Sequence, residues 1–432
     1  MKMDGRPLRV CLAPVEVAGY YAHLQQGLEA AGCRVTRLSL QPSAQAYQPP
    51  VSFWPSRLAL RLQRAAKSHS VNLRGRLLSK CASLTLLVLA IRAIVSSDVL
   101  IYAFASTISW HSKLELRFAK WMRRRIVFVF HGSDSRPPYL DPQTLSQNVG
   151  MSTAKLRELV DERYAKVRWC DSVADEVIDN PFSAHFHGRS CVSWHAIGVP
   201  YAAVPQIPPP PPHNERVRVL HCPSHPETKG TPVIREAVDR LIDKGLPIDY
   251  VEIIGRPNAE VLHEIARCDV VIDQAYSDVP MAGLATEAAA YGRPAIVGSL
   301  AVAQFSQFIA ATDMPPTYVC HPNNIETAIE RIVGDRELRE QLGRDAHAFV
   351  LRHRSARAVA QRMVLVIKGQ VPTQWKFDPG CIAYGGGCGS PLTIKKAIAE
   401  LVGEYGPSAL KLDDRPTLRG AVLAECALSN LP

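Results

Sequence analysis

Residues 273–297 read DQAYSDVPMAGLATEAAAYGRPAIV, and this stretch decides how the fold is interpreted. An apolar strand over 269–273 ends in a turn of small residues, and a helix that contains Glu287 follows it. The segment Tyr291-Gly292-Arg293-Pro294 ends this helix before a new apolar strand begins at Ala295. The order strand, helix, strand predicts a parallel α/β sheet, in which ligands bind beyond the carboxyl ends of the strands.

Glu287 lies about one turn inside the predicted helix. The N-terminus of such a helix points amide groups at phosphates. An acid in this position can accept hydrogen bonds from ribose hydroxyls, so the arrangement suits a nucleotide diphosphate. In the alternative interpretation, Glu287 only stabilises the N-terminus of its own helix electrostatically.

The composition is that of a soluble globular protein. The chain has 432 residues, of which 47% are hydrophobic and 21% are charged, and this length favours two or three domains with well-buried cores. Its eleven cysteines form no CxxC pair and no Cys/His cluster at zinc spacing, which favours reduced thiols in a cytoplasmic protein over a metal site. We expect no signal peptide, and the longest apolar stretch, 81–91, is shorter than a membrane span.

The net charge of +10 is concentrated in one part of the chain. Residues 30–97 contain no Asp or Glu, and within Trp54–Lys67 apolar residues alternate with cations as in an amphipathic basic helix. Such a helix can lie on an anionic membrane surface or attract a lipid-linked phosphate. The alternative is a solvated basic face without a partner. We expect no nucleic-acid partner, because no nucleic-acid-binding module accompanies the charge.

The pattern predicts two Rossmann-like, doubly wound α/β domains that face each other across a cleft. Residues 1–204 are predicted to form the first domain and residues 216–370 the second. In both, short apolar runs typical of buried parallel strands alternate with amphipathic helices. The runs 98–103 and 125–130 are the clearest of these strands in the first domain.

Two segments lie outside the predicted domains. Residues 205–215 include an unbroken run of prolines, Pro208–Pro212, which is stiff and extended and therefore serves as a linker. The tail, 371–432, contains the glycine run 385–387 and is expected to be flexible there. One amphipathic helix, 392–405, is predicted after it, and the sequence assigns the tail no role.

Three strand-end segments of the second domain carry groups suited to a diphosphate. Lys229-Gly230-Thr231 lies between a strand and a helix, where an ammonium and helix amides can meet a diphosphate together. Gly255-Arg256 ends the next strand with a cation beside a glycine. The turn before Glu287 is the third segment. Each is weak alone, but each follows a different strand of one domain, so together they indicate a phosphate-binding site.

With these motifs, the chain resembles the two-domain nucleotide-sugar glycosyltransferases of the GT-B fold, most closely the broad, retaining, metal-independent family four. The resemblance covers residues 8–365 in the order and spacing of elements. It is most specific at Lys229-Gly-Thr, at the Glu287-Ala-x-Ala-x-Gly-x-Pro run, and at Val129-Phe-His131-Gly-Ser-Asp134. It implies that the second domain holds the nucleotide-sugar and the first domain the acceptor, without a metal or other cofactor.

The resemblance also implies roles for individual residues. Lys229 would contact the diphosphate of the donor, and Glu287 would contact the ribose. His131, at a strand end that faces the cleft, would approach the donor sugar. Gly283 and Leu284 would offer backbone amides to the phosphates. Gly19 would give the phosphates room near the first loop.

Two departures from the family pattern concern the donor site. A second glutamate, which commonly meets the transferred sugar, is replaced by Val279, and the nearest acid is Asp278. The arginine usually found five residues before the lysine is Ser224, which leaves His225 or Arg256 as substitutes. The donor identity and one phosphate contact therefore depend on residues outside the family pattern.

The expected reaction is transfer of a sugar from a nucleotide diphosphate to a cell-surface glycan or glycolipid acceptor at the inner face of a membrane. Breaking the bond between sugar and diphosphate builds negative charge, which fixed cations and amides stabilise. No carboxylate pair stands out as nucleophile and acid, unlike in the usual glycosidase, and this fits a front-side mechanism in which the departing phosphate takes the acceptor proton. Inversion would need a base, for which His23, His131 or Asp134 could serve. The alternatives are a sugar-nucleotide epimerase and a catalytically silent binding protein in a glycan-assembly complex.

Overall fold

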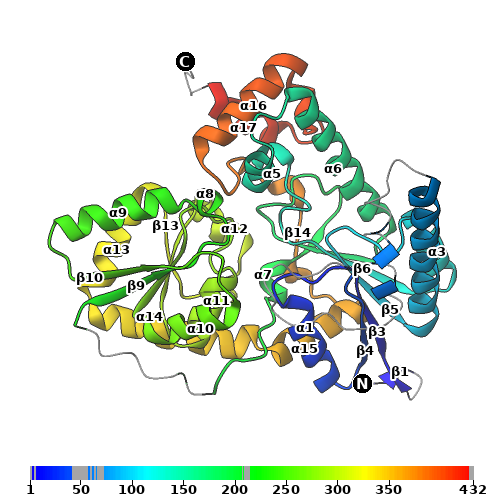
Figure 1. The fold of residues 1–432 in the computed structure, drawn as a ribbon, viewed down its shortest axis with the longest axis horizontal. Helices are drawn as coiled ribbons and strands as arrows, with labels where there is room; N and C mark the ends of the chain where they lie inside the picture. Colours follow the sequence, from blue (N-terminus) through cyan, green and yellow to red (C-terminus); the bar gives the residue numbers. More distant parts are fainter. Residues whose placement is uncertain are drawn as a thin grey trace.

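A computed structural model of the chain shows two α/β domains, each built on a mainly parallel sheet, that lie side by side (Figure 1). The described residues are 2–3, 6–40, 57–58, 61–62, 65, 73–206, 208 and 215–427. Most of the expected basic helix over 54–67 lies outside these residues, and so does most of the proline-rich linker 205–215.

The first domain contains a seven-stranded sheet with the order β14-β8-β7-β6-β5-β3-β4. All neighbouring strands are parallel except β14, which pairs antiparallel with β8. This is a doubly wound order, with its switch point between β3 and β5. The strands are β3 (Arg9–Ala13), β4 (Arg34–Arg37), β5 (Val99–Ala103), β6 (Arg125–Val129), β7 (Glu176–Asp179), β8 (Cys191–Ser193) and β14 (Lys376–Phe377), and a small hairpin, β1 (Lys2–Met3) and β2 (Arg6–Pro7), precedes them.

Helices cover both faces of this sheet. One face packs against α1 and α15, and the other packs against α3, α4, α6 and the C-terminal helices. Burial on both faces explains why β5 and β6 read as continuous apolar runs. The helices are α1 (Tyr20–Ala30), α3 (Leu73–Ser96), α4 (Ser112–Trp121), α5 (Pro142–Gln147), α6 (Thr153–Val173), α7 (Trp194–Ile197), α15 (Ala356–Lys368), α16 (Pro391–Tyr405) and α17 (Pro416–Ala427).

The second domain contains a five-stranded parallel sheet with the order β10-β9-β11-β12-β13 and a switch point between β9 and β11. The strands are β9 (Val217–His221), β10 (Ile248–Glu252), β11 (Val270–Gln274), β12 (Ala295–Gly298) and β13 (Tyr318–Cys320). The helices are α8 (Pro226–Lys229), α9 (Thr231–Asp243), α10 (Asn258–Arg267), α11 (Gly283–Ala290), α12 (Phe305–Phe308), α13 (Ile325–Gly334) and α14 (Arg336–Phe349).

After α14 the chain crosses back to the first domain. Val359 and Met363 of α15 are fully buried in the core that also contains residues of α1. The two helices touch at Gly27, where an added Cβ would lie 2.1 Å from the carbonyl oxygen of Ala356. Helix α15 therefore completes the core of the first domain, although it falls within the range 216–370 assigned to the second. The apolar periodicity predicts the helix but does not say which sheet it covers.

The tail is folded onto the first domain, and the expectation of flexibility around its glycine run is wrong. Strand β14 extends the first sheet, and α16 and α17 lie beside α5 and α6 at the top of Figure 1. The glycine run is held by contacts, because the hydroxyl of Tyr384 donates to the carbonyl of Gly387 (2.6 Å). A Cβ on Gly387 would lie 2.5 Å from the carbonyl oxygen of Leu140. The glycine there permits close packing rather than mobility.

Helix α3 is longer than its central apolar stretch suggests. Among the described residues, it is the one helix long and apolar enough to cross a membrane, over Arg74–Ser96, and 33% of its most apolar window is buried inside the protein. The sequence analysis considered only residues 81–91 and therefore underestimated the length of the apolar helix, which extends beyond this stretch on both sides.

We expect Gly27→Ala to destabilise the protein, because the added methyl group would overlap the carbonyl of Ala356. Overpacking of this kind costs about 1–3 kcal/mol in the free energy of unfolding, which urea denaturation measures. Gly403→Ala in α16 is the matched control, since nothing lies within 4 Å of its added Cβ, and we expect it to stabilise the helix by about 0.5–1 kcal/mol. Equal effects of the two substitutions would contradict the close packing of α1 and α15.

Candidate functional site

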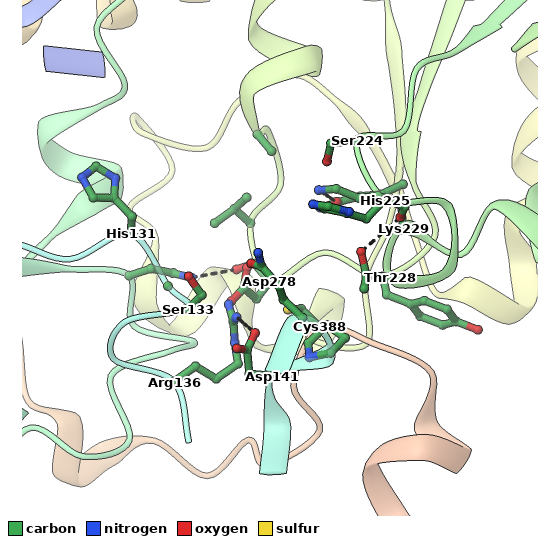
Figure 2. Close-up of a pocket in the computed structure, with 18 of the residues that line it drawn as sticks. His131, Ser133, Arg136, Asp141, Ser224, His225, Thr228, Lys229, Asp278 and Cys388 are labelled. Carbon is green, nitrogen blue, oxygen red and sulfur yellow. Dashed lines mark hydrogen bonds and ion pairs between the residues drawn. The ribbon is translucent and has the colours of Figure 1, made fainter. Parts of the chain in front are cut away.

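A cleft of about 280 Å³ lies between the two domains. The first domain contributes the loop after β6, the second contributes the loops after β9 and β11, and the tail contributes Cys388. Figure 2 shows that the labelled lining residues come from both domains, with Arg136 and Asp278 between them. Since β9 and β11 flank the switch point of the second sheet, the cleft lies where doubly wound sheets bind their ligands.

Lys229 is held in place at the carboxyl end of β9. Its ammonium donates a hydrogen bond to Oε1 of Gln274, and its carbonyl accepts one from the amide of Ala275 (2.8 Å). The next residue, Gly230, has a φ of 70°, and a Cβ there would lie 2.6 Å from the Cβ of Ala275. Only glycine fits this position, so the Lys-Gly pair fixes a cation in the cleft before any ligand arrives.

Glu287 lies in α11, which follows β11, and it is not among the residues that line the cleft. It is 7% exposed, and Nδ2 of Asn258 donates to its Oε1 (2.8 Å). Burial raises the pKa of Glu287 to about 7, the bond from Asn258 opposes this shift, and the neighbouring Asp273 adds to it. Burial also raises the pKa of Asp273, and Lys229 opposes that shift. The charges of Lys229, Asp273 and Glu287 are therefore coupled.

His131 lines the cleft from the end of β6 and sits among aromatic rings. Its Nε2 is 2.9 Å from the hydroxyl of Tyr21, and its ring meets Tyr20 edge-on and stacks on Phe104. Burial lowers the pKa of His131 to about 3, so the imidazole is neutral at physiological pH. It can form a hydrogen bond with a sugar hydroxyl, but it is a weak base.

The sequence did not single out Arg136, which joins the two domains in the cleft. Its Nη2 pairs with Oδ2 of Asp278, and its Nη1 lies 3.4 Å from Oδ1 of Asp141 (Figure 2). Burial lowers the pKa of Arg136, but Asp278, Cys388 and Asp141 together raise it above its ordinary value, so the guanidinium stays charged. The only local signal was its place five residues after His131, and its partner Asp278 lies far away in the sequence.

Asp278, Ser224 and His225, at or beside the positions where the chain departs from the family pattern, line the cleft, whereas Arg256 does not. Arg256 is exposed, lies 3.9 Å from Glu260, and borders a different hollow of the second domain. The expectation that Arg256 serves the phosphate site is therefore wrong. The reason is the strand order: Arg256 follows β10, which is the edge strand on the side of β9 away from β11.

The three positions expected to serve the phosphates through the backbone differ in their surroundings. Gly19 has a φ of 80° and directly precedes Tyr20, whose ring contacts His131. Gly283 begins α11, is exposed, and has nothing within 4 Å of an added Cβ. Leu284 is partly buried against the core behind it. Of these, Gly283 has the most open space for a ligand.

The candidate bases for inversion are poorly placed. Asp134 is buried, its Oδ1 accepts from the amide of His131 (2.8 Å), and burial raises its pKa to about 7, but it does not line the cleft. Nδ1 of His23 is 3.1 Å from the carbonyl oxygen of Pro200, and burial lowers the pKa of His23. Of the three, only His131 reaches the cleft, and its pKa makes it a weak base. Within the described part of the chain, no group of three or more His, Cys, Asp or Glu is arranged to hold a metal ion.

No protein-family model matches the chain, and no curated protein matches it. Solved structures similar to it include HepE of Anabaena in complex with UDP and glucose, at 12% identity and a TM-score of 0.46, covering 84% of this chain and 100% of that one. Sucrose-phosphate synthase of Thermosynechococcus elongatus has 13% identity and a TM-score of 0.45, covering 84% and 98%. The glycosyltransferase SnogD of Streptomyces nogalater has 13% identity and a TM-score of 0.41, covering 84% and 100%.

We expect Arg136→Met to destabilise the protein by about 3–5 kcal/mol, because it leaves Asp141 and Asp278 buried without their cation. The control is Arg336→Met, whose ion pair with Glu340 is exposed (2.8 Å, 72% exposed arginine), so that its loss should have a much smaller effect on stability. Denaturant unfolding measures both losses, and similar losses in the two variants would contradict a buried inter-domain pair.

Proposed function

We propose that the protein is a nucleotide-sugar glycosyltransferase of the GT-B type, which binds the donor diphosphate between Lys229 and Arg136. The observation that carries the proposal is that these two cations come from different domains and line one cleft at the switch point of the second sheet. Lys229 is fixed by Gln274, and Arg136 is fixed by Asp141 and Asp278. Both cations are therefore in place before the reaction begins.

The chemistry follows from where charge develops. As the bond between the anomeric carbon and the diphosphate oxygen breaks, its electron pair leaves with the diphosphate. Fixed cations and the amides at the start of α11 stabilise this charge more in the transition state than in the ground state. The acceptor oxygen bonds to the anomeric carbon, and its proton passes to the departing phosphate oxygen. Lys229 and Arg136 would thus act by stabilising the leaving group.

We propose retention of configuration, with the leaving group as the proton acceptor. The cleft carboxylates, Asp141 and Asp278, are both paired with Arg136, so neither can approach an acceptor hydroxyl without breaking an ion pair. The neutral His131 suits a hydrogen bond to the donor sugar better than proton abstraction. These features favour a front-side reaction over direct inversion.

In this proposal Arg136 provides the second phosphate-binding cation, for which the sequence suggested only His225 or Arg256. The cleft volume of about 280 Å³ is slightly below that of typical ligand sites, which are about 300–1,000 Å³. Donor entry therefore requires the cleft to widen, and the contact between Arg136 and Asp278 is the link that would open. A phosphate would then replace Asp278 as the partner of Arg136.

The acceptor is proposed to belong to cell-surface polysaccharide or glycolipid assembly at the cytoplasmic face of a membrane. The support is that the acid-free stretch 30–97, with its many cations, belongs to the first domain. Turnover of a nucleotide-sugar in a mixture of lipid-linked and soluble glycan acceptors tests this directly. Transfer supports the proposal, whereas rearrangement of the donor without an acceptor would identify an epimerase.

Calorimetry with UDP and GDP tests the phosphate site. At least one nucleotide should bind, and Lys229→Ala should weaken it about 10- to 100-fold, since a charge-assisted hydrogen bond contributes about 1.5–3 kcal/mol. Arg256→Ala is the matched control and should leave the affinity unchanged, because Arg256 lies outside the cleft. Binding of neither nucleotide would favour a catalytically silent module, and equal losses in the two variants would contradict the assigned site.

The pH dependence of UDP-glucose binding tests the role of Glu287. Ribose hydroxyls donate to the carboxylate form, so binding must release the proton that Glu287 holds below its pKa of about 7. We therefore expect affinity to increase about tenfold from pH 6 to pH 8. The diphosphate diester of this ligand does not titrate in that range. Glu287→Gln should remove the pH dependence, and an unchanged profile in this variant would show that Glu287 does not contact the ribose.

A further inference from the structure

Helix α3 is apolar on two opposite sides. One side packs in the core of the first domain, through residues that include Leu86, Ala90 and Ile94. The other side is open to solvent. Its exposed apolar residues are Leu77 (55% exposed), Leu84 (63%), Val88 (57%), Ile91 (42%) and Val95 (49%). Their spacing of seven, four, three and four residues places them in one stripe along the helix.

Helix α4 continues this exposed surface. Oγ of Ser83 is 2.9 Å from Nε2 of His111 at the start of α4, and Nε of Arg124, just after α4, donates to the carbonyl of Ile94 (3.0 Å). The two helices therefore run side by side in the same direction. Exposed apolar residues at α4 are Trp110 (51%), Leu114 (57%) and Trp121 (74%). We call these three residues and the α3 stripe the α3–α4 face.

The charge around this face has one sign. The exposed cations of the two helices and their ends are Arg74, Arg76, Lys80, Arg92, Lys113, Arg117, Lys120 and Arg123. The only acid within α3 and α4 is Glu115, which is 1% exposed and points inward. It accepts hydrogen bonds from the hydroxyl of Tyr102 (2.7 Å) and from the amides of Ile108 and Ser109. No acidic side chain of these helices therefore offsets the surface cations.

We propose that the α3–α4 face docks the protein on an anionic lipid bilayer. Apolar residues flanked by cations, with tryptophans at the border, are the features of helices that lie in the membrane interface. A second copy of the chain is a poorer partner, because self-association through this face would bring cations against cations. Helix α3 would lie along the surface rather than cross it, since its inner side belongs to the core.

The position of this face fits such docking. Figure 1 shows α3 on the outer flank of the first domain, on the side away from the second domain. Docking there leaves the second domain free to move relative to the first. The docking itself does not depend on the proposed function. Only its purpose does, which is to bring the acceptor-binding domain to a lipid-linked acceptor.

Vesicle flotation of the full chain tests the proposal. The wild type should float with vesicles of phosphatidylcholine and phosphatidylglycerol but not with phosphatidylcholine alone. The double variant Leu84→Glu/Val88→Glu should reduce the bound fraction at least tenfold, and Lys113→Glu/Lys120→Glu should weaken binding about fivefold or more per cation. The matched control is Val149→Glu/Leu392→Glu, which alters apolar residues that lie elsewhere and are even more exposed (89% and 69%). This control should bind vesicles as the wild type does.

A parallel measurement separates this proposal from the function of the cleft. Thermal stabilisation by whichever of UDP and GDP binds should be the same in the wild type and in Leu84→Glu/Val88→Glu, which would show that the variant is folded. Flotation without any response to UDP or GDP would overturn the proposed donor site and leave the docking intact. Unchanged flotation of the variant would overturn the docking. The docking would also be overturned if the wild type did not bind vesicles and instead formed a dimer, detected by sedimentation velocity, that the variant did not form.

Discussion

The whole arrangement depends on the direction of the parallel strands. Strands β6, β9 and β11 end at one cleft, because every parallel strand of a doubly wound sheet delivers its following loop to the same edge. At that edge of the second sheet, Gly230 fits into a space that excludes any side chain, and this holds Lys229 against β11. The first domain contributes Arg136 to the same cleft. Positive charge from two separate domains thus meets in one place.

The cations in the cleft also have structural partners, and this affects how the site can work. Arg136 is buried between Asp141 and Asp278, one from each domain, so the same contact closes the cleft and keeps the guanidinium charged. Removing a partner from a buried ion pair is costly unless another anion replaces it. A diphosphate is such an anion. Donor binding and domain opening would therefore be coupled through one side chain.

Local patterns predicted much of the fold and part of the site. The strand-end segments around Lys229, Glu287 and His131 can be identified in the sequence, because a buried strand, a turn and the start of a helix each have a characteristic pattern within a few consecutive residues. The order of strands in a sheet has no such local sequence pattern. Arg256 was therefore placed at the phosphate site, although β10 is an edge strand that carries it away from the cleft. The role of Arg136 was missed because its partner Asp278 lies in the other domain.

The same limit explains the errors in organisation. The periodicity of α15 predicts a helix, but only the fit against Gly27 shows that it covers the first sheet. The glycine run before α16 resembles a flexible segment, yet Gly387 is packed against Leu140. The most direct measurement of the central claim is a crystal structure of the protein with UDP or GDP, whichever binds. We predict that the diphosphate lies within hydrogen-bonding distance of both Lys229 and Arg136, with Asp278 displaced. A diphosphate bound elsewhere, with the Arg136–Asp278 pair intact, would contradict the account.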